Sequence, residues 1–259
     1  MRMLDLFSGI GGFALAAQWV WGDDLEIVSF CEIDKFCQKV LKKHWPDVPC
    51  CTDVKKIQGK DYGTVDILTG GFPCQDLSYA GKLAGIRGER SGLWKEMYRI
   101  IGEIRPRYAI MENVTALLTG ESGEWFSVLL SDLAEVGYDA EWHCIQAANI
   151  GAPHRRDRVW VIAYPESQNA PEPMGLGGIL AQGDWETKKW RESWELFKLE
   201  SEFMAPTKWW DSGQSCCQPL LVRNDDGVPN KLDRSGACGN AIVPQVAEVI
   251  FRAIKEIDQ

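Results

Sequence analysis

The sequence lacks a long apolar segment. No run of apolar residues approaches the roughly 18 that a membrane-spanning helix needs. The opening residues, MRMLDLFSG, are interrupted by polar residues and glycine before the apolar core of a signal peptide can form. We therefore expect a protein that has no membrane partner and stays in the cytoplasm.

Positive charge is also scarce. The chain has 28 Lys and Arg against 37 Asp and Glu, which gives a net charge of -9. A nucleic acid is normally bound by a basic face, so this balance counts against a nucleic-acid partner. A local basic cleft can nevertheless coexist with an acidic exterior, and the densest basic cluster is HRRDR at 154–158. The charge balance therefore weakens the nucleic-acid hypothesis without excluding it.

None of the nine cysteines has the two-residue spacing of a zinc knuckle or a redox motif. The count is odd, and two pairs are adjacent in the chain, at 50–51 and 216–217. Reduced thiols in a reducing compartment are the expected state for most of them. Cys74 is the exception, for reasons of context given below.

At 259 residues the chain can bury a full core. Its first two-thirds alternate short apolar runs with helical patterns, which is typical of a parallel sheet with crossover helices. Strands are predicted at 3–7, 27–34, 65–73, 108–113, 140–147 and 158–164. Helices are predicted after residue 12, with Phe13, Leu15, Ala16 and Trp19 as its apolar positions, and at 36–45, 93–104, 126–136 and 246–257.

Composition changes at Pro165, after which Pro, Gly, Trp and charged residues dominate as far as about residue 233. We predict a catalytic and cofactor-binding domain at 1–164 and an irregular region at 165–235. The segment 236–259 is expected to return to the first domain as a helix.

A glycine-rich turn, DLFSGIGGF, follows the first predicted strand and opens a helix. Such a turn lets a ligand approach a helix amino terminus, although many strand-to-helix turns bind nothing. Glu32 ends the next strand about twenty residues later, where an acid can hold a ribose. Asp53 is a candidate acceptor for an adenine amino group, although taken in isolation it is better explained as a solvated loop acid.

Three further groups of polar residues lie at or beside the ends of predicted strands. Cys74 lies in GGFPCQDLS, just past a buried strand at the carboxyl edge of the sheet. Most loop cysteines are inert, but basic residues in the next loop would favour a thiolate. Glu112 and Asn113 end another strand, and Arg156 and Arg158 should share one side of the last strand. A helix cap and a surface salt-bridge patch are the simpler alternatives for these two pairs.

In this order, DLFSGIGGF, CEIDKF, TDV, GGFPCQDLS, ENV, HRRDRVW and GNAIVPQVA resemble the successive motifs of the carbon-5 DNA cytosine methyltransferase family, in its compact bacterial and phage type. The resemblance covers nearly the whole chain except 165–233, where that family keeps its target-recognition region. It implies an α/β, Rossmann-like methyltransferase sheet with helices on both faces, plus a small irregular target-recognition region. Two departures are His154, where the family has glutamine, and 221–238, where its penultimate motif is not recognisable.

The resemblance also implies roles for individual residues. It implies S-adenosyl-L-methionine as cofactor, S-adenosyl-L-homocysteine as product and no metal. Cys74 would attack carbon 6 of a flipped cytosine, Glu112 would engage nitrogen 3 and the amino group, and Arg158 would hold the carbonyl oxygen, with Asn113 and Arg156 in support. Gln75, Ser78 and Arg90 would lie on the loop that closes over DNA. The cofactor pocket would comprise Phe7, Gly9, Gly11, Gly12, Glu32, Ile33, Asp53, Val54, Pro73, Leu93 and Asn240.

The implied partner is double-stranded DNA, bound by a monomer in a bacterial or phage-infected cell, and a cognate restriction endonuclease is left open. One alternative is a tRNA cytosine-5 methyltransferase, although that branch usually carries Pro-Pro-Cys where this chain has Phe-Pro-Cys. Another is a non-catalytic DNA-binding relative, which the intact Cys74, Glu112 and Arg158 disfavour. A nicotinamide-dependent dehydrogenase would explain neither the Pro-Cys-Gln loop nor ENV.

Overall fold

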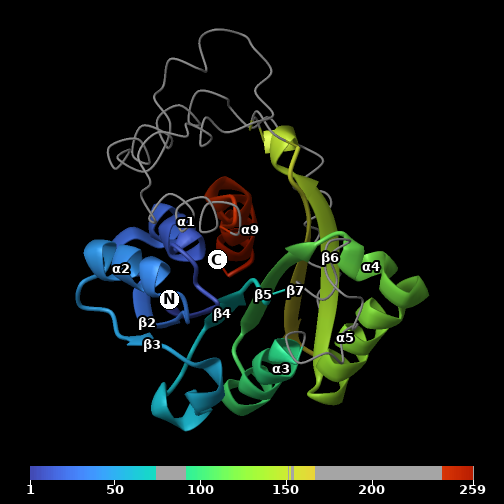
Figure 1. Cartoon of the computed structure of the whole chain (residues 1–259), viewed down its shortest axis with the longest axis horizontal. Coiled ribbons are helices and arrows are strands. Elements are labelled where there is room, and N and C mark those ends of the chain that lie inside the picture. The colour runs from blue at the N-terminus through green and yellow to red at the C-terminus, as the bar shows by residue number, and fades with distance from the viewer. Residues whose placement is uncertain (74–91, 151, 153–154, 167–240, 259) are drawn as a thin grey trace, which may run out of the picture.

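A computed structural model describes residues 1–73, 92–150, 152, 155–166 and 241–258. A seven-stranded sheet runs through it in the order β3-β2-β1-β4-β5-β7-β6 (Figure 1). The strands are β1 (Arg2–Leu6), β2 (Glu26–Cys31), β3 (Cys50–Cys51), β4 (Ile67–Gly70), β5 (Tyr108–Val114), β6 (Tyr138–Gln146) and β7 (Asp157–Pro165). The α-helices are α1 (Gly12–Trp21), α2 (Lys35–His44), α3 (Leu93–Ile104), α4 (Ala116–Thr119), α5 (Glu124–Glu135) and α9 (Pro244–Ile257).

The sheet is mixed, which corrects the expectation of a parallel sheet. Strands β1 to β5 pair in parallel, whereas β7 is antiparallel to both of its neighbours, β5 and β6. Only residues 147–156 separate β6 from β7, and a parallel crossover needs a dozen or more. The prediction of a Rossmann-like α/β fold with helices on both faces is confirmed.

Each face of the sheet has its own core. On one face, Trp94 of α3 and Leu129 of α5 pack with Leu6 and Val161 of the sheet. On the other, α1 and α9 lie side by side over β1, β4 and β7, with Phe251 among the buried residues (Figure 1). Helix α2 covers the β2 end of this second face. The parallel part of the sheet is therefore covered by helices on both faces.

The buried face of α1 is wider than the sequence indicates. Phe13 and Ala16 are buried as expected, but Leu15 and Trp19 are only partly buried, while Val20 is buried. The helix contacts the sheet and α9 together, so its apolar residues need not follow a single stripe. The apolar pattern therefore identified the helix and misplaced its most buried side.

The predicted region 165–235 lies outside the described residues apart from its first two positions. Among the helices of the described segments, none is long and apolar enough to cross a membrane.

Asp5 is a charged group at the centre of the sheet. Its side chain is fully buried, and its Oδ1 atom accepts a 2.6 Å hydrogen bond from the Thr69 hydroxyl. Its Oδ2 atom has no hydrogen-bond partner within the described structure. Burial raises the pKa of Asp5 to about 7, even though Thr69 and Ser8 act to lower it. The folded state therefore holds a proton at Asp5 more tightly than the unfolded chain does.

We predict that Asp5→Asn makes stability less dependent on pH. Because the folded pKa of Asp5 lies above the unfolded one, wild-type stability should fall as pH rises from about 4 to about 7, by up to roughly 4 kcal/mol. Asparagine cannot ionise and keeps the acceptor for Thr69. Urea unfolding from pH 4.5 to 8, with the exposed Asp47→Asn as control, measures the difference. Parallel pH curves for wild type and Asp5→Asn would contradict it.

Candidate active site

The glycine turn after β1 is shaped by close contacts that exclude side chains. Phe7, Gly9 and Gly11 all have positive φ, at 53°, 54° and 88°. A Cβ atom on Gly11 would lie 2.5 Å from the Trp45 ring, and one on Gly12 would lie 2.7 Å from Ile242. No side chain caps the first amides of α1. The first turn of α1 therefore has backbone amides that no side chain caps, and such amides suit an anionic or polar ligand.

Glu32 is tied to this turn. Its Oε2 atom accepts a 2.7 Å hydrogen bond from the Gly9 amide, and its Oε1 atom accepts one of 2.7 Å from the Asp34 amide. Each carboxylate oxygen keeps a further lone pair for a ligand hydroxyl. Ile33, beside it, is 80% exposed, which is unusual for a large apolar residue. Together they offer a charged acceptor and an open apolar surface.

Asp53 and Val54 follow β3, the neighbour of β2 in the sheet. Register pairing of Cys31 with Cys51 brings the ends of the two strands level, so Asp53 reaches the same edge of the sheet as Glu32. The Asp53 carboxylate accepts a 3.0 Å bond from the Lys55 amide, and Val54 is buried. The two-residue strand β3 was not predicted.

A second part of the site lies at the end of β5. Arg158 of β7 places its Nε atom 3.1 Å from Oε1 of Glu112, and the Glu112 side chain is only 10% exposed. Burial raises the pKa of Glu112, while the positive charges of Arg158 and Arg156 act in the opposite direction. This carboxyl group therefore holds a proton more readily than a solvated glutamate would.

Arg156 and Arg158 line one narrow pocket together with Glu112, which matches the predicted placement of the two arginines on one side of the strand. The pocket walls also include residues that the sequence did not single out, namely Ile145, Ala147, Trp160, Val243 and Val246. Trp160 is the register partner of Glu112 across β5 and β7, which explains its position. An Arg156 guanidinium N–H donates to the Ala241 carbonyl and so ties the pocket to the segment before α9.

Asn113 does not face this pocket. Its Nδ2 atom donates a 3.2 Å bond to the Phe72 carbonyl, and its Oδ1 atom accepts a 2.8 Å bond from the Val114 amide. Phe72 precedes Pro73, so Asn113 fixes the backbone that leads to residue 74. Pro73 and Leu93 flank the loop between β4 and α3. Predicted residues outside the described part of the chain are Cys74, Gln75, Ser78, Arg90 and Asn240.

A family model described as C-5 cytosine-specific DNA methylase matches residues 1–215. The chain belongs to this family. It is 39% identical to the Type II methyltransferase M1.ScrFI of Lactococcus lactis subsp. cremoris, over 63% of this chain and 41% of that protein. It is also 39% identical to the Type II methyltransferase M2.BsuMI of Bacillus subtilis, over 80% of this chain and 56% of that protein. The chain thus spans about half the length of the curated relatives it matches.

Among solved structures, the chain resembles Spodoptera frugiperda DNMT2 in a mutant form, with a TM-score of 0.55 and 22% identity over 66% of this chain and 52% of that one. It also resembles the Dnmt2 methyltransferase of S. pombe, with a TM-score of 0.55 and 19% identity over 72% and 57%. At these identities the likeness concerns the fold alone, and it supports the Rossmann-like α/β sheet.

We predict that Arg158→Ala destabilises the protein by about 2–3 kcal/mol, because Glu112 loses its ion-pair partner while remaining buried. The loss is smaller than for a fully buried pair, since the Arg158 side chain is 22% exposed. Adding Glu112→Gln should restore part of it by removing the uncompensated charge. Urea unfolding measures both effects, with Arg252→Ala, which breaks the surface pair with Glu248, as control. Equal losses in the single and double variants would contradict the prediction.

Proposed function

We propose that this chain is a DNA (cytosine-5-)-methyltransferase. It would move a methyl group from S-adenosyl-L-methionine to carbon 5 of a cytosine that is flipped out of a short, specific duplex DNA sequence. The observation that carries the proposal is the buried Glu112 carboxyl group paired with Arg158 in a pocket. That pocket combines an acid able to hold a proton with a guanidinium donor, which suits the pairing edge and carbonyl of one base. Duplex DNA is the proposed partner.

The glycine turn and Glu32 fit the cofactor. The uncapped amides of α1 suit the carboxylate of the cofactor. The Glu32 carboxylate suits its ribose, and the exposed Ile33 suits its adenine. Asp53 would accept a hydrogen bond from the adenine amino group, with Val54 beside it, and Pro73, Leu93 and Asn240 would complete the pocket. When bound, the cofactor supplies an electrophilic sulfonium methyl group.

The remaining steps belong to the protein's own residues. The Cys74 thiolate adds to carbon 6 of the cytosine, and the electron pair of the 5,6 double bond moves to carbon 5. Glu112 donates its proton at nitrogen 3, and Arg158 donates to the carbonyl oxygen, so that both stabilise the covalent adduct. Once carbon 5 carries the methyl group, its proton passes to water. The electron pair of that C–H bond re-forms the 5,6 double bond and expels the Cys74 thiolate, and nitrogen 3 returns its proton to Glu112.

Base flipping is part of the proposal, because carbon 6 is inaccessible inside the stack and extrusion costs a few kcal/mol. Asn113 would contribute by fixing the Phe72 backbone before Cys74, and Arg156 by holding the pocket wall. Gln75, Ser78 and Arg90 would contact DNA from the loop after Cys74. A monomer in the cytoplasm of a bacterial or phage-infected cell is proposed, and the Type II names of its relatives support a restriction endonuclease as a second partner.

We expect Cys74→Ser to abolish methyl transfer, because a hydroxyl group is a far weaker nucleophile than a thiolate. Cofactor binding should be retained. Incubation with tritiated S-adenosyl-L-methionine and either duplex DNA or tRNA measures activity and separates the DNA and RNA alternatives. Wild type should also form a stable adduct with duplex DNA containing 5-fluorocytosine, because fluorine blocks the final elimination. Turnover by the serine variant, or labelling of tRNA alone, would refute the proposal.

We also propose that 165–235 reads the target sequence, since 1–164 and the helix within 236–259 supply the sheet and its cover. Exchange of 165–235 for the corresponding segment of a family member with another target should change the methylated sequence, because base-edge contacts carry specificity. Bisulfite sequencing of DNA from an expressing host reads the methylated site. An unchanged site in an active chimera would locate recognition in the catalytic domain instead.

A further inference from the structure

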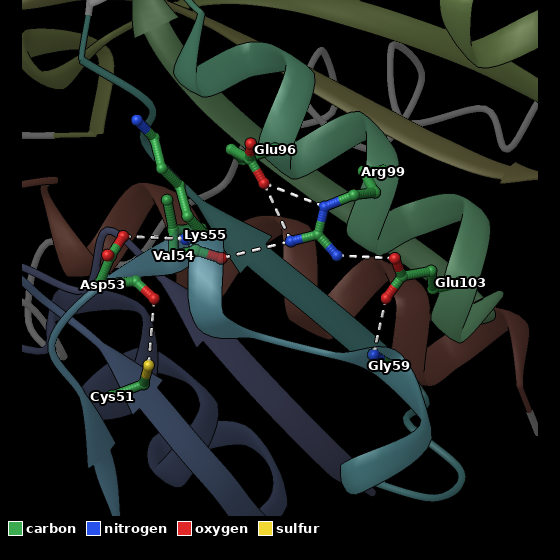
Figure 2. A network of polar contacts seen from close by, with 8 residues as sticks. All are labelled: Cys51, Asp53, Val54, Lys55, Gly59, Glu96, Arg99 and Glu103. Atoms are coloured by element: carbon green, nitrogen blue, oxygen red, sulfur yellow. Dashed lines mark hydrogen bonds and ion pairs between the residues drawn. The ribbon is translucent and has the colours of Figure 1, made fainter.

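The outward face of α3 carries an ion-pair cluster centred on Arg99. The Arg99 Nε atom donates a 3.0 Å bond to Glu96, one turn earlier, and its Nη1 atom donates a 2.7 Å bond to Glu103, one turn later. Figure 2 shows the guanidinium held between the two carboxylates. Such a geometry fixes the plane of the guanidinium, whose Nη2 atom also lies 2.9 Å from Glu96.

The cluster reaches across to the loop after β3 at two points. Arg99 Nη2 donates a 3.4 Å bond to the Val54 carbonyl, and Glu103 Oε2 accepts a 2.8 Å bond from the Gly59 amide (Figure 2). The loop lies close to the helix, since a Cβ atom on Gly59 would be only 2.7 Å from the Glu103 Cβ. The segment from Val54 to Gly59 is therefore held to α3 at both ends.

Stability alone does not account for this cluster. The side chains of Arg99, Glu96 and Glu103 remain 33%, 24% and 38% exposed, and surface pairs of this kind contribute about 0–1 kcal/mol. Burial acts to lower the pKa of Arg99, but the two carboxylates outweigh it and raise the pKa. Because pairs this exposed add little stability, the main effect of the cluster is to fix geometry.

What the cluster fixes is the turn that carries Asp53 and Val54. The Asp53 carbonyl accepts a 3.2 Å bond from the Cys51 thiol, and its carboxylate accepts from the Lys55 amide (Figure 2). Those bonds order the turn internally, while Arg99 sets where it lies relative to α3. The same helix begins at Leu93, another residue of the proposed cofactor pocket.

We propose that Arg99, braced by Glu96 and Glu103, is a positioning residue that holds the Asp53–Val54 turn in place for the adenine of the cofactor. The inference rests on the proposed function, which assigns that turn to the adenine. It adds a residue that touches neither cofactor nor DNA and acts only through the Val54 carbonyl and, by way of Glu103, the Gly59 amide.

Arg99→Ala should weaken binding of S-adenosyl-L-homocysteine about tenfold, the scale of losing hydrogen bonds from a charged donor. Adenosine, measured by competition, should lose affinity by the same factor, because only the adenine end of the pocket is displaced. The KM for S-adenosyl-L-methionine should rise similarly, whereas kcat at saturating cofactor and the KM for DNA should stay within about twofold. The cofactor affinity of Arg99→Lys should lie between those of wild type and Arg99→Ala. One ammonium group cannot bind three acceptors at once in the fixed geometry of a guanidinium.

Two comparison variants make the result decisive. Arg252→Ala breaks an i,i+4 pair with Glu248 on α9 and should leave cofactor affinity unchanged. Glu32→Ala removes the proposed acceptor for the ribose hydroxyls and should by itself lower the affinity for the cofactor. If Arg99→Ala bound like wild type while Glu32→Ala was weakened, the positioning role would be wrong. If wild type did not bind the cofactor, the proposed function would fail instead.

Unequal losses for adenosine and S-adenosyl-L-homocysteine would also overturn the inference, because they would put the disturbance outside the adenine end. Should Arg99→Ala not fold, Glu103→Gln supplies the same test. It keeps an acceptor for the Gly59 amide but removes the charge that orients Arg99, so a smaller loss, again equal for the two ligands, is expected. Unchanged affinity in Glu103→Gln would count against the role of the cluster.

Discussion

The packing of α9 on α1 is the interaction on which both halves of the site depend. Ile242, just before α9, lies so close to Gly12 that a methyl group there would not fit, and this contact seats the helix against the glycine turn. Val243 and Val246 of the same segment line the pocket of Glu112. The α9 segment thus contacts both the glycine turn proposed to hold the cofactor and the pocket proposed to hold the base.

The electrostatics of the site explain how an acidic protein could bind the proposed anionic substrate. The net charge of -9 describes the whole chain, whereas the pocket places Arg156 and Arg158 around a single buried carboxyl group. Burial raises the pKa of Glu112, so the local charge there is more positive than a count of residues implies. Net charge therefore sets long-range attraction and says little about the chemistry of a cleft.

The sequence was sufficient to predict every strand except β3, most helices and the residues at the carboxyl ends of the strands, because periodicity and glycine turns are local signals. It did not predict that β7 is antiparallel to β5 and β6, since strand direction follows from the short connection at 147–156 and not from apolar periodicity. It also missed Trp94 and Trp160, which lie beside residues that were predicted. Their roles come from helix packing and strand register, and neither is encoded within a single segment.

Asn113 and Arg99 each hold a backbone carbonyl near one half of the site. Asn113 acts beside the proposed base pocket, and Arg99 acts beside the proposed cofactor pocket. Asn113 holds the carbonyl of Phe72, two residues before Cys74, while Arg99 holds that of Val54 in the cofactor loop. Residues 74–91 stand between Pro73 and helix α3 in the sequence. Helix α3 begins at Leu93, and Arg99 lies on it. A displacement of α3 would therefore move one end of the loop that carries the proposed nucleophile and one wall of the proposed adenine site together. The placement of this one helix therefore bears on both proposed sites at once.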